Sequence, residues 1–95
     1  MKEDLLQIIE HFGIDSQQRK LQEEVFELQK EIIIVEQGNN QSVNEISEEF
    51  VDVLIILKQI FHYYQLDEDK LKDIERNKIE RTLKRISTNY YEGGK

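Results

Sequence analysis

The sequence predicts an all-α protein of four helices, on three observations. The 95 residues include no proline and only four glycines, so the residues that interrupt helices and mark strand turns are nearly missing. Glu, Lys, Gln, Leu and Ile dominate the composition, and most of these are good helix formers. Apolar residues recur every three or four positions along much of the chain, which places them on one face of a helix.

The first two helices are expected at residues 2–11 and 16–37. Gly13 is a natural C-terminal cap for the first, because glycine adopts the left-handed backbone conformation without a steric cost. Asp15 or Ser16 has the short polar side chain that caps a helix N-terminus, and either is expected to begin the second helix.

The second helix carries one apolar stripe and two apolar side chains outside it. The stripe consists of Leu21, Val25, Leu28, Ile32 and Val35. Phe26 and Ile33 point to a different side of the helix. They predict a second buried surface, against another helix or another subunit.

The third helix is expected to follow a loop at residues 38–41 and to continue to about Tyr64. Ser42 with Glu45 three residues later has the pattern of a capping box. The second half of this helix, residues 53–61, is apolar nearly all round, which predicts burial in a core of protein. The apolar run is too short to span a bilayer.

The fourth helix is expected to begin after Asp67, a good N-cap, and to end near Ile86. Residues 87–95 look like a flexible tail. The length of the chain suits one domain over residues 1–95.

Composition excludes several classes of function. Twenty acidic and 13 basic residues give a net charge of −7, which argues against binding a nucleic-acid backbone. The chain has no cysteine, and therefore neither a disulfide framework nor a thiolate metal site. No secretory signal or membrane-spanning run is recognised, so we expect a cytoplasmic protein with no membrane partner.

Two pairs of acids suggest a metal site. Glu24 and Glu27 are three residues apart, and so are Glu49 and Asp52, so each pair shares a helix face. Two antiparallel helices joined by a short loop would bring the pairs together. Four converging carboxylates repel one another unless a cation lies between them, and oxygen ligands suit Mg²⁺ or Mn²⁺.

The alternative is that these acids are ordinary solvated surface residues. Against it, Glu49 and Asp52 share an angular sector with Ile56, Ile60 and Tyr63, so they should face the packed side of the bundle. In its favour, Glu pairs at this spacing are common in helices. Spacing alone leaves both interpretations open.

The motifs resemble those of a known superfamily. Residues 23–27, Glu-Glu-Val-Phe-Glu, match EExxE, and residues 49–52, Glu-Phe-Val-Asp, match ExxD followed by an apolar run. The chain is similar over residues 17–85 to the MazG-like all-α nucleoside triphosphate pyrophosphohydrolases. The resemblance implies a four-helix bundle completed by oligomerisation as a homodimer or homotetramer. It also implies Mg²⁺-dependent cleavage between the α and β phosphates, with Glu24, Glu27, Glu49 and Asp52 as metal ligands.

The same resemblance suggests helper residues. Glu23 is the favoured general base and Glu48 a weaker candidate, although each is more often a plain surface acid. Lys78 and Arg81 are similar to a basic K-x-x-R element that would bind phosphate. A solvated basic stripe near a helix C-terminus explains them equally well. Apart from the resemblance, Lys20 and Gln17 lie on the face that carries the first acidic pair. This makes Lys20 a further candidate for phosphate binding and Gln17 one for contact with a phosphate or a base edge, although exposed helix positions are the commoner explanation for both.

The predicted function is therefore Mg²⁺-dependent hydrolysis of (deoxy)nucleoside triphosphates to monophosphate and pyrophosphate. A dUTPase or phosphoribosyl-ATP pyrophosphatase activity is the nearest alternative. The second of these is disfavoured, because residues 53–58 read Val-Leu-Ile-Ile-Leu-Lys and lack its tyrosine-histidine ending. The alternative from another class is a non-catalytic helical interaction module.

Overall fold

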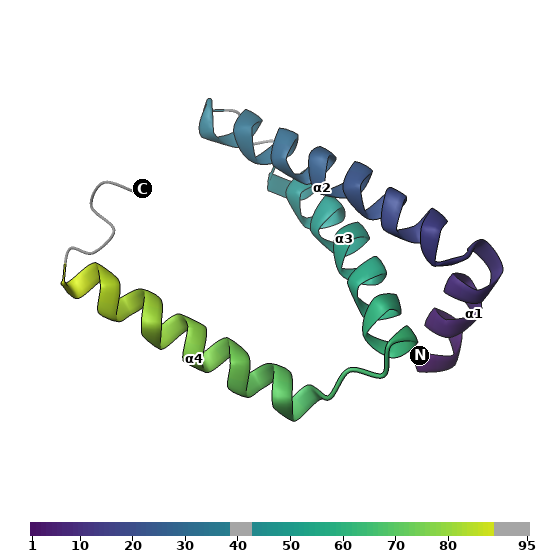
Figure 1. The fold of residues 1–95 in the computed structure, drawn as a ribbon. Helices are drawn as coiled ribbons and strands as arrows, with labels where there is room; N and C mark the ends of the chain where they lie inside the picture. The colour runs from purple at the N-terminus through teal and green to yellow at the C-terminus, as the bar shows by residue number, and fades with distance from the viewer. Residues whose placement is uncertain (39–42, 89–95) are drawn as a thin grey trace. The chain divides into compact units, whose positions relative to one another are not determined.

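The computed structural model describes residues 1–38 and 43–88. This part of the chain contains four helices and no strand (Figure 1). The helices are α1 (Lys2–Phe12), α2 (Ile14–Glu36), α3 (Val43–Tyr63) and α4 (Glu68–Ser87). The all-α prediction is confirmed, and each helix bound falls within two residues of the expected one.

Contacts divide the chain into two compact units, Met1–Gln65 and Leu66–Lys95. The first unit holds α1, α2 and α3, and the second holds α4. The single domain expected over residues 1–95 stays a prediction.

A corner at Gly13 joins α1 directly to α2. Its backbone N–H donates to the carbonyl of Ile9 at 2.7 Å, and its carbonyl accepts from the N–H of Gln17 at 3.0 Å. One residue thus ends one helix and begins the next. Its φ of 91° and ψ of 151° lie in a region that essentially only glycine adopts. The expected C-terminal cap is confirmed.

The N-cap expected at Asp15 or Ser16 is wrong, because α2 begins at Ile14 and both residues lie inside its first turn. Gly13 occupies the N-cap position, and no side chain caps this helix end. The capping box expected at Ser42 falls outside the described residues.

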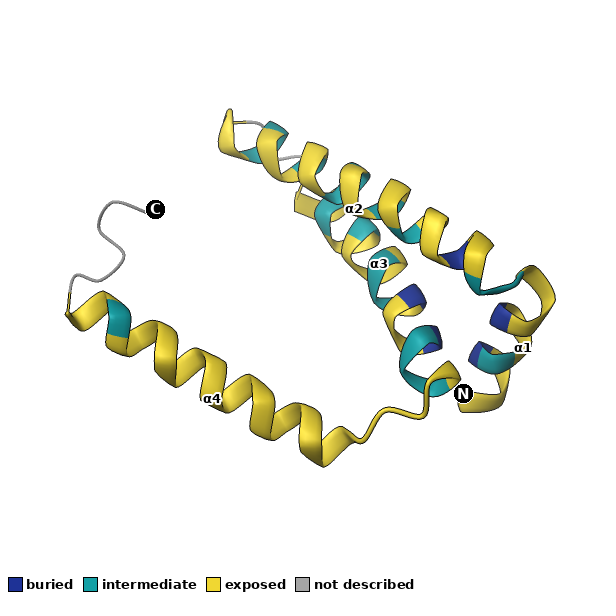
Figure 2. Cartoon of the chain, viewed as in Figure 1, coloured by how far each residue is buried: buried dark blue, intermediate teal, exposed yellow. Residues whose placement is uncertain are grey.

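The three helices of the first unit pack against one another around a small core. Its buried apolar side chains are those of Leu5, Ile9 and Ile56 (Figure 2). Gln17 and Gln59 are buried beside them, and the Nε2 of Gln17 donates to the Oε1 of Gln59 at 2.9 Å. This bond joins the start of α2 to the end of α3, so the two helices run antiparallel.

The apolar second half of α3 is only partly covered, contrary to the expectation of burial on all sides. Ile56 is buried, but Ile55 and Leu57 are 39% and 46% exposed. The reason is that, within the first unit, α1 and α2 cover only part of the circumference of α3.

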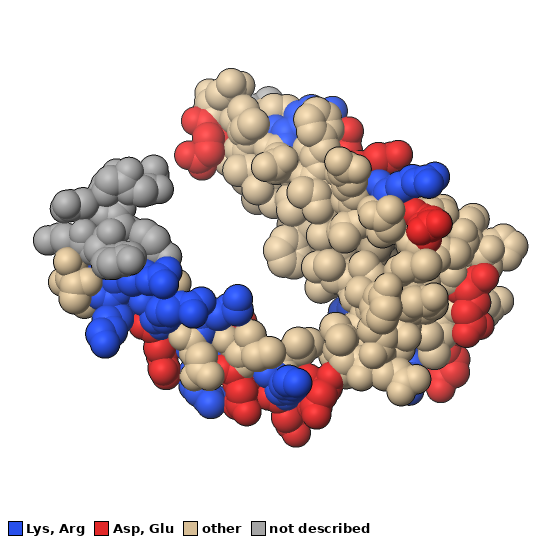
Figure 3. Space-filling view, viewed as in Figure 1, with Lys and Arg blue, Asp and Glu red and all other residues tan. Residues whose placement is uncertain are grey.

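Helix α4 begins as predicted. The side chain of Asp67 accepts hydrogen bonds from the backbone N–H groups of Asp69 and Lys70, at 2.9 and 3.2 Å. Acids occupy the first turn of α4, and Lys84 and Arg85 the last, where each sign of charge suits the helix dipole (Figure 3). Ser87 is still helical, so the tail expected from residue 87 begins no earlier than Thr88; residues 89–95 lie outside the described part.

No residue of α4 is buried, and only Arg85 is half-buried (Figure 2). Leu71, Ile79 and Leu83 are among its exposed apolar side chains. Across the described ranges, every helix is too short or too polar to cross a bilayer.

The Gly13 corner yields a prediction about stability. Gly13→Ala should lower the free energy of unfolding by about 1–3 kcal/mol, because alanine is strained at this φ and ψ. Beyond the adjoining residues, no atom lies within 4 Å of the added methyl group, so the loss would come from the backbone alone. Urea denaturation measures it. Gln18→Ala, at an exposed helical position, should change stability little, and an equal loss in both variants would contradict this account.

Candidate functional site

Three of the four predicted acids converge where α2 and α3 pack. Carboxylate oxygens of Glu24, Glu49 and Asp52 all lie within 4.8 Å of one another. Glu24 comes from α2, and the other two come from successive turns of α3. The side chain of Glu24 is only 17% exposed, Glu49 is half-buried and Asp52 is exposed.

Glu27, the fourth predicted ligand, lies apart from this group. Its Oε1 forms an ion pair with the Nζ of Lys30 at 3.0 Å, one turn further along α2. It is nevertheless near the cluster, since its charge contributes to the raised pKa of Glu49. The structure therefore brings three carboxylates together and holds the fourth beside them.

The electrostatics of the cluster show most clearly at Glu49. Desolvation raises the pKa of this carboxyl above its usual value, and the negative charges of Asp52 and Glu24 raise it further. A neighbouring cation would have the opposite effect. Lys20 does supply one positive charge, with its Nζ 3.4 Å from Glu24, but the cluster keeps an excess of negative charge.

The other predicted helpers lie around the cluster or away from it. Lys20, expected to bind phosphate, lies at its edge as the partner of Glu24. Glu23 is exposed and lines a shallow depression together with Glu24 and Glu27. Glu48 is exposed on α3.

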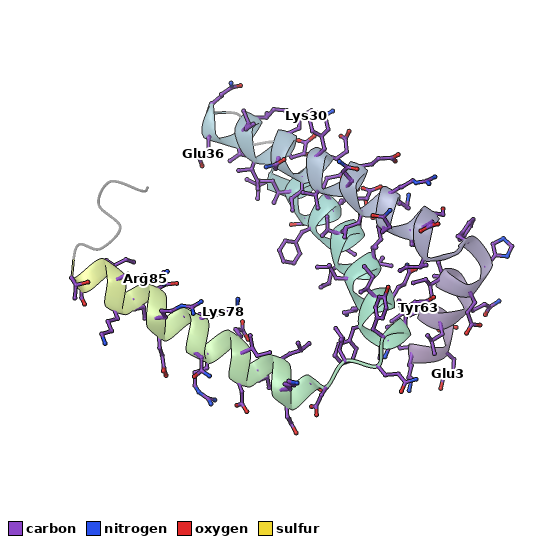
Figure 4. The ribbon with its side chains drawn as sticks, viewed as in Figure 1. Glu3, Lys30, Glu36, Tyr63, Lys78 and Arg85 are labelled. Atoms are coloured by element: carbon purple, nitrogen blue, oxygen red, sulfur yellow. The ribbon has the colours of Figure 1, made fainter. Side chains whose placement is uncertain are left out.

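Lys78 and Arg81 belong to α4, in the second unit. Lys78 lies seven residues before Arg85, which is two helical turns (Figure 4). The Thr82 hydroxyl donates to the Lys78 carbonyl at 2.9 Å. Lys78 and Thr82 line a small surface pocket of about 230 Å³.

A larger pocket, of about 450 Å³, adjoins the acidic cluster. Glu24 and Asp52 line it, and so do the buried glutamines Gln17 and Gln59. The sequence interpretation left Gln17 open between an exposed helix position and a contact with a phosphate or a base edge, and did not single out Gln59 as a site residue. A signal was present: Gln17 lies seven residues before Glu24 and Gln59 seven after Asp52, so each glutamine shares a helix face with an acid.

The arrangement fits a hard divalent cation. All the clustered side-chain donors are carboxylate oxygens, which Mg²⁺ and Mn²⁺ prefer, and their mutual repulsion is what a bound cation would relieve. Comparisons with protein-family models, with curated proteins and with solved structures give no match to the chain.

The raised pKa of Glu49 predicts how the stability of the metal-free protein depends on pH. The native state binds this proton more tightly than the unfolded state, so stability should fall as pH rises from about 4.5 through the native pKa. Glu49→Gln removes the titrating group. The variant should therefore be more stable than the parent at neutral pH, with a flatter profile.

Thermal melting in EDTA across pH 4–8 measures this effect. Glu48→Gln, at the neighbouring exposed position, is the control and should follow the parent. A Glu49→Gln protein that melts below the parent at neutral pH would show that the carboxylate is stabilising, against this account.

Proposed function

We propose that the protein is a Mg²⁺-dependent nucleotide pyrophosphohydrolase. It would hydrolyse a (deoxy)nucleoside triphosphate, with one water, to the monophosphate and pyrophosphate. The observation that carries the proposal is the cluster of Glu24, Glu49 and Asp52, with oxygens within 4.8 Å, at the edge of a 450 Å³ pocket. The EExxE and ExxD motifs, which contain these acids, support the same activity.

Glu24, Glu49 and Asp52 would hold the metal, with Glu27 next to them as a further oxygen donor. When bound, Mg²⁺ neutralises the polyphosphate and stabilises the negative charge that develops at phosphorus. Binding also has an energetic basis in the chain itself: the charges of Asp52 and Glu24 raise the pKa of Glu49, and a bound dication would relieve the same repulsion.

The remaining roles belong to residues around the cluster. Glu23, exposed beside Glu24, would accept the proton of the attacking water, with Glu48 as the weaker candidate. Lys20 would exchange its ion pair with Glu24 for a phosphate oxygen once the metal takes up the carboxylate. Lys78 and Arg81 are proposed to bind phosphate, on the sequence motif alone.

Assembly as a homodimer or homotetramer is part of the proposal. Phe26, Ile33 and Phe50 are more than half exposed, and Val51 and Leu57 nearly so, on the helices that carry the site. Figure 3 shows a wide uncharged surface over this unit. Exposed apolar side chains in such number are typical of surfaces that bind other proteins.

Among alternative functions, the exposed apolar surfaces also favour a non-catalytic helical interaction module, because they suit a protein partner as well as a second copy. dUTP or phosphoribosyl-ATP as substrate stays an alternative within the enzyme class. Activity and metal binding separate the enzyme from the interaction module.

Asp52→Asn and Glu24→Gln should each reduce Mg²⁺-dependent pyrophosphate release by at least about a hundredfold, because a metal ligand is lost while the shape is kept. A coupled assay for pyrophosphate with a panel of deoxynucleoside triphosphates measures this. Glu36→Gln, at the end of α2, is the matched control and should keep full activity. Undiminished activity in both site variants would refute the assignment.

Metal binding should also appear as stabilisation. Millimolar Mg²⁺ or Mn²⁺ should raise the melting temperature of the parent protein, because a ligand that binds only the native state stabilises it by mass action. Asp52→Asn should abolish the rise. A parent protein whose melting temperature ignores both metals would favour the interaction module.

A further inference from the structure

The pocket beside the acidic cluster contains a buried polar pair. Gln17 is 4% exposed and Gln59 is 1% exposed, and the two amides share one hydrogen bond of 2.9 Å. Each of them lines the pocket, as do Glu24 and Asp52. One cavity therefore has carboxylates in one part of its wall and carboxamides in another.

The hydrogen bond between the amides occupies only one end of each. It leaves the Oε1 of Gln17 as an acceptor and the Nε2 of Gln59 as a donor. No side-chain nitrogen or oxygen among the described residues is both buried and without a partner. The two remaining amide ends are therefore not sealed from solvent, and because both residues line the pocket, an acceptor on Gln17 and a donor on Gln59 are available to a molecule bound there.

Helix geometry sets the distance between the two parts. Seven residues separate Gln17 from Glu24 on α2, and seven separate Asp52 from Gln59 on α3. Two helical turns cover about 10 Å. A nucleotide bridges a span of this order between its phosphates and the edge of its base. The wall also includes Phe12, 58% exposed, and Ile55, 39% exposed, which offer an aromatic ring and an apolar face to a flat base.

We propose that this pocket binds the nucleobase of the triphosphate and that Gln17 and Gln59 read its hydrogen-bonding edge, accepting keto and amino bases alike. The inference rests on the proposed function. Rotation of the two side-chain amides is what allows the pocket to accept both keto and amino bases. If both amides turn over, Gln59 donates to Gln17, and the free ends become a donor on Gln17 and an acceptor on Gln59.

The pair therefore matches either order of donor and acceptor. Cytosine presents an amino donor next to a ring nitrogen acceptor, and uracil presents a carbonyl acceptor next to a ring N–H donor. A side chain that could only donate, or only accept, would reject one of these two bases, because a buried polar group would be left unpaired. Two amides bonded to each other keep their mutual bond in both states.

The test compares pyrophosphate release, with Mg²⁺, from dCTP, dUTP and the triphosphate of base-free deoxyribose. The proteins are the full-length parent, Gln17→Met, Phe12→Ala and the control Gln18→Met, whose exposed side chain lies next to Gln17 in sequence. The parent should use dCTP and dUTP with kcat/KM values within about tenfold of each other. Gln17→Met should raise KM for both by about five- to tenfold more than it raises KM for the base-free substrate.

Each outcome decides between distinct accounts. A Gln17→Met effect equal on all three substrates would show that the amide pair only joins α2 to α3, and would overturn the inference. So would a parent preference above a hundredfold for either base. If Gln17→Met fails to fold by circular dichroism, Phe12→Ala decides in the same way, since it alters a largely exposed side chain. Release from no substrate at all would refute the proposed function itself.

Discussion

The buried hydrogen bond between Gln17 and Gln59 fixes how α2 lies against α3, and the rest of the site depends on that register. In an antiparallel pair, moving seven residues forward from Gln17 and seven back from Gln59 leads to Glu24 and Asp52, which do meet. A slip of one residue would rotate a helix face by about 100° and separate the acids. A polar contact between buried amides tolerates such a slip far less than apolar packing does, because any shift leaves an amide unpaired.

The acidic cluster destabilises the helix packing that brings its carboxylates together. Like charges and desolvation raise the pKa of Glu49, so the native state is strained at neutral pH by groups that the unfolded chain would hold apart. With a small apolar core of Leu5, Ile9 and Ile56, the first unit gains little free energy from apolar burial to offset this strain. A bound cation would relieve the repulsion among the carboxylates, and a covering subunit would bury more apolar surface. Both are parts of the proposed function.

Much of the fold could be predicted from the sequence because it depends on local chemistry. Helix bounds, the end of α1 at Gly13 and the cap at Asp67 follow from residues close together in the chain. The burial of Gln17 and the position of Glu27 could not be predicted in the same way. Gln17 is buried because Gln59, forty-two residues away, supplies its partner, and Glu27 pairs with Lys30 rather than joining the cluster. The start of α2 was predicted wrongly because Gly13 is both the C-cap of α1 and the N-cap of α2.

That glycine has a consequence for how a ligand would be held. α1 carries Phe12 and α2 carries Gln17, two walls of the same pocket, and the only non-helical residue between the helices is Gly13. Walls joined by a long loop must lose conformational entropy when a ligand draws them together. Here the corner is already set by backbone hydrogen bonds to Ile9 and Gln17, so most of that entropy is lost during folding, before any ligand arrives.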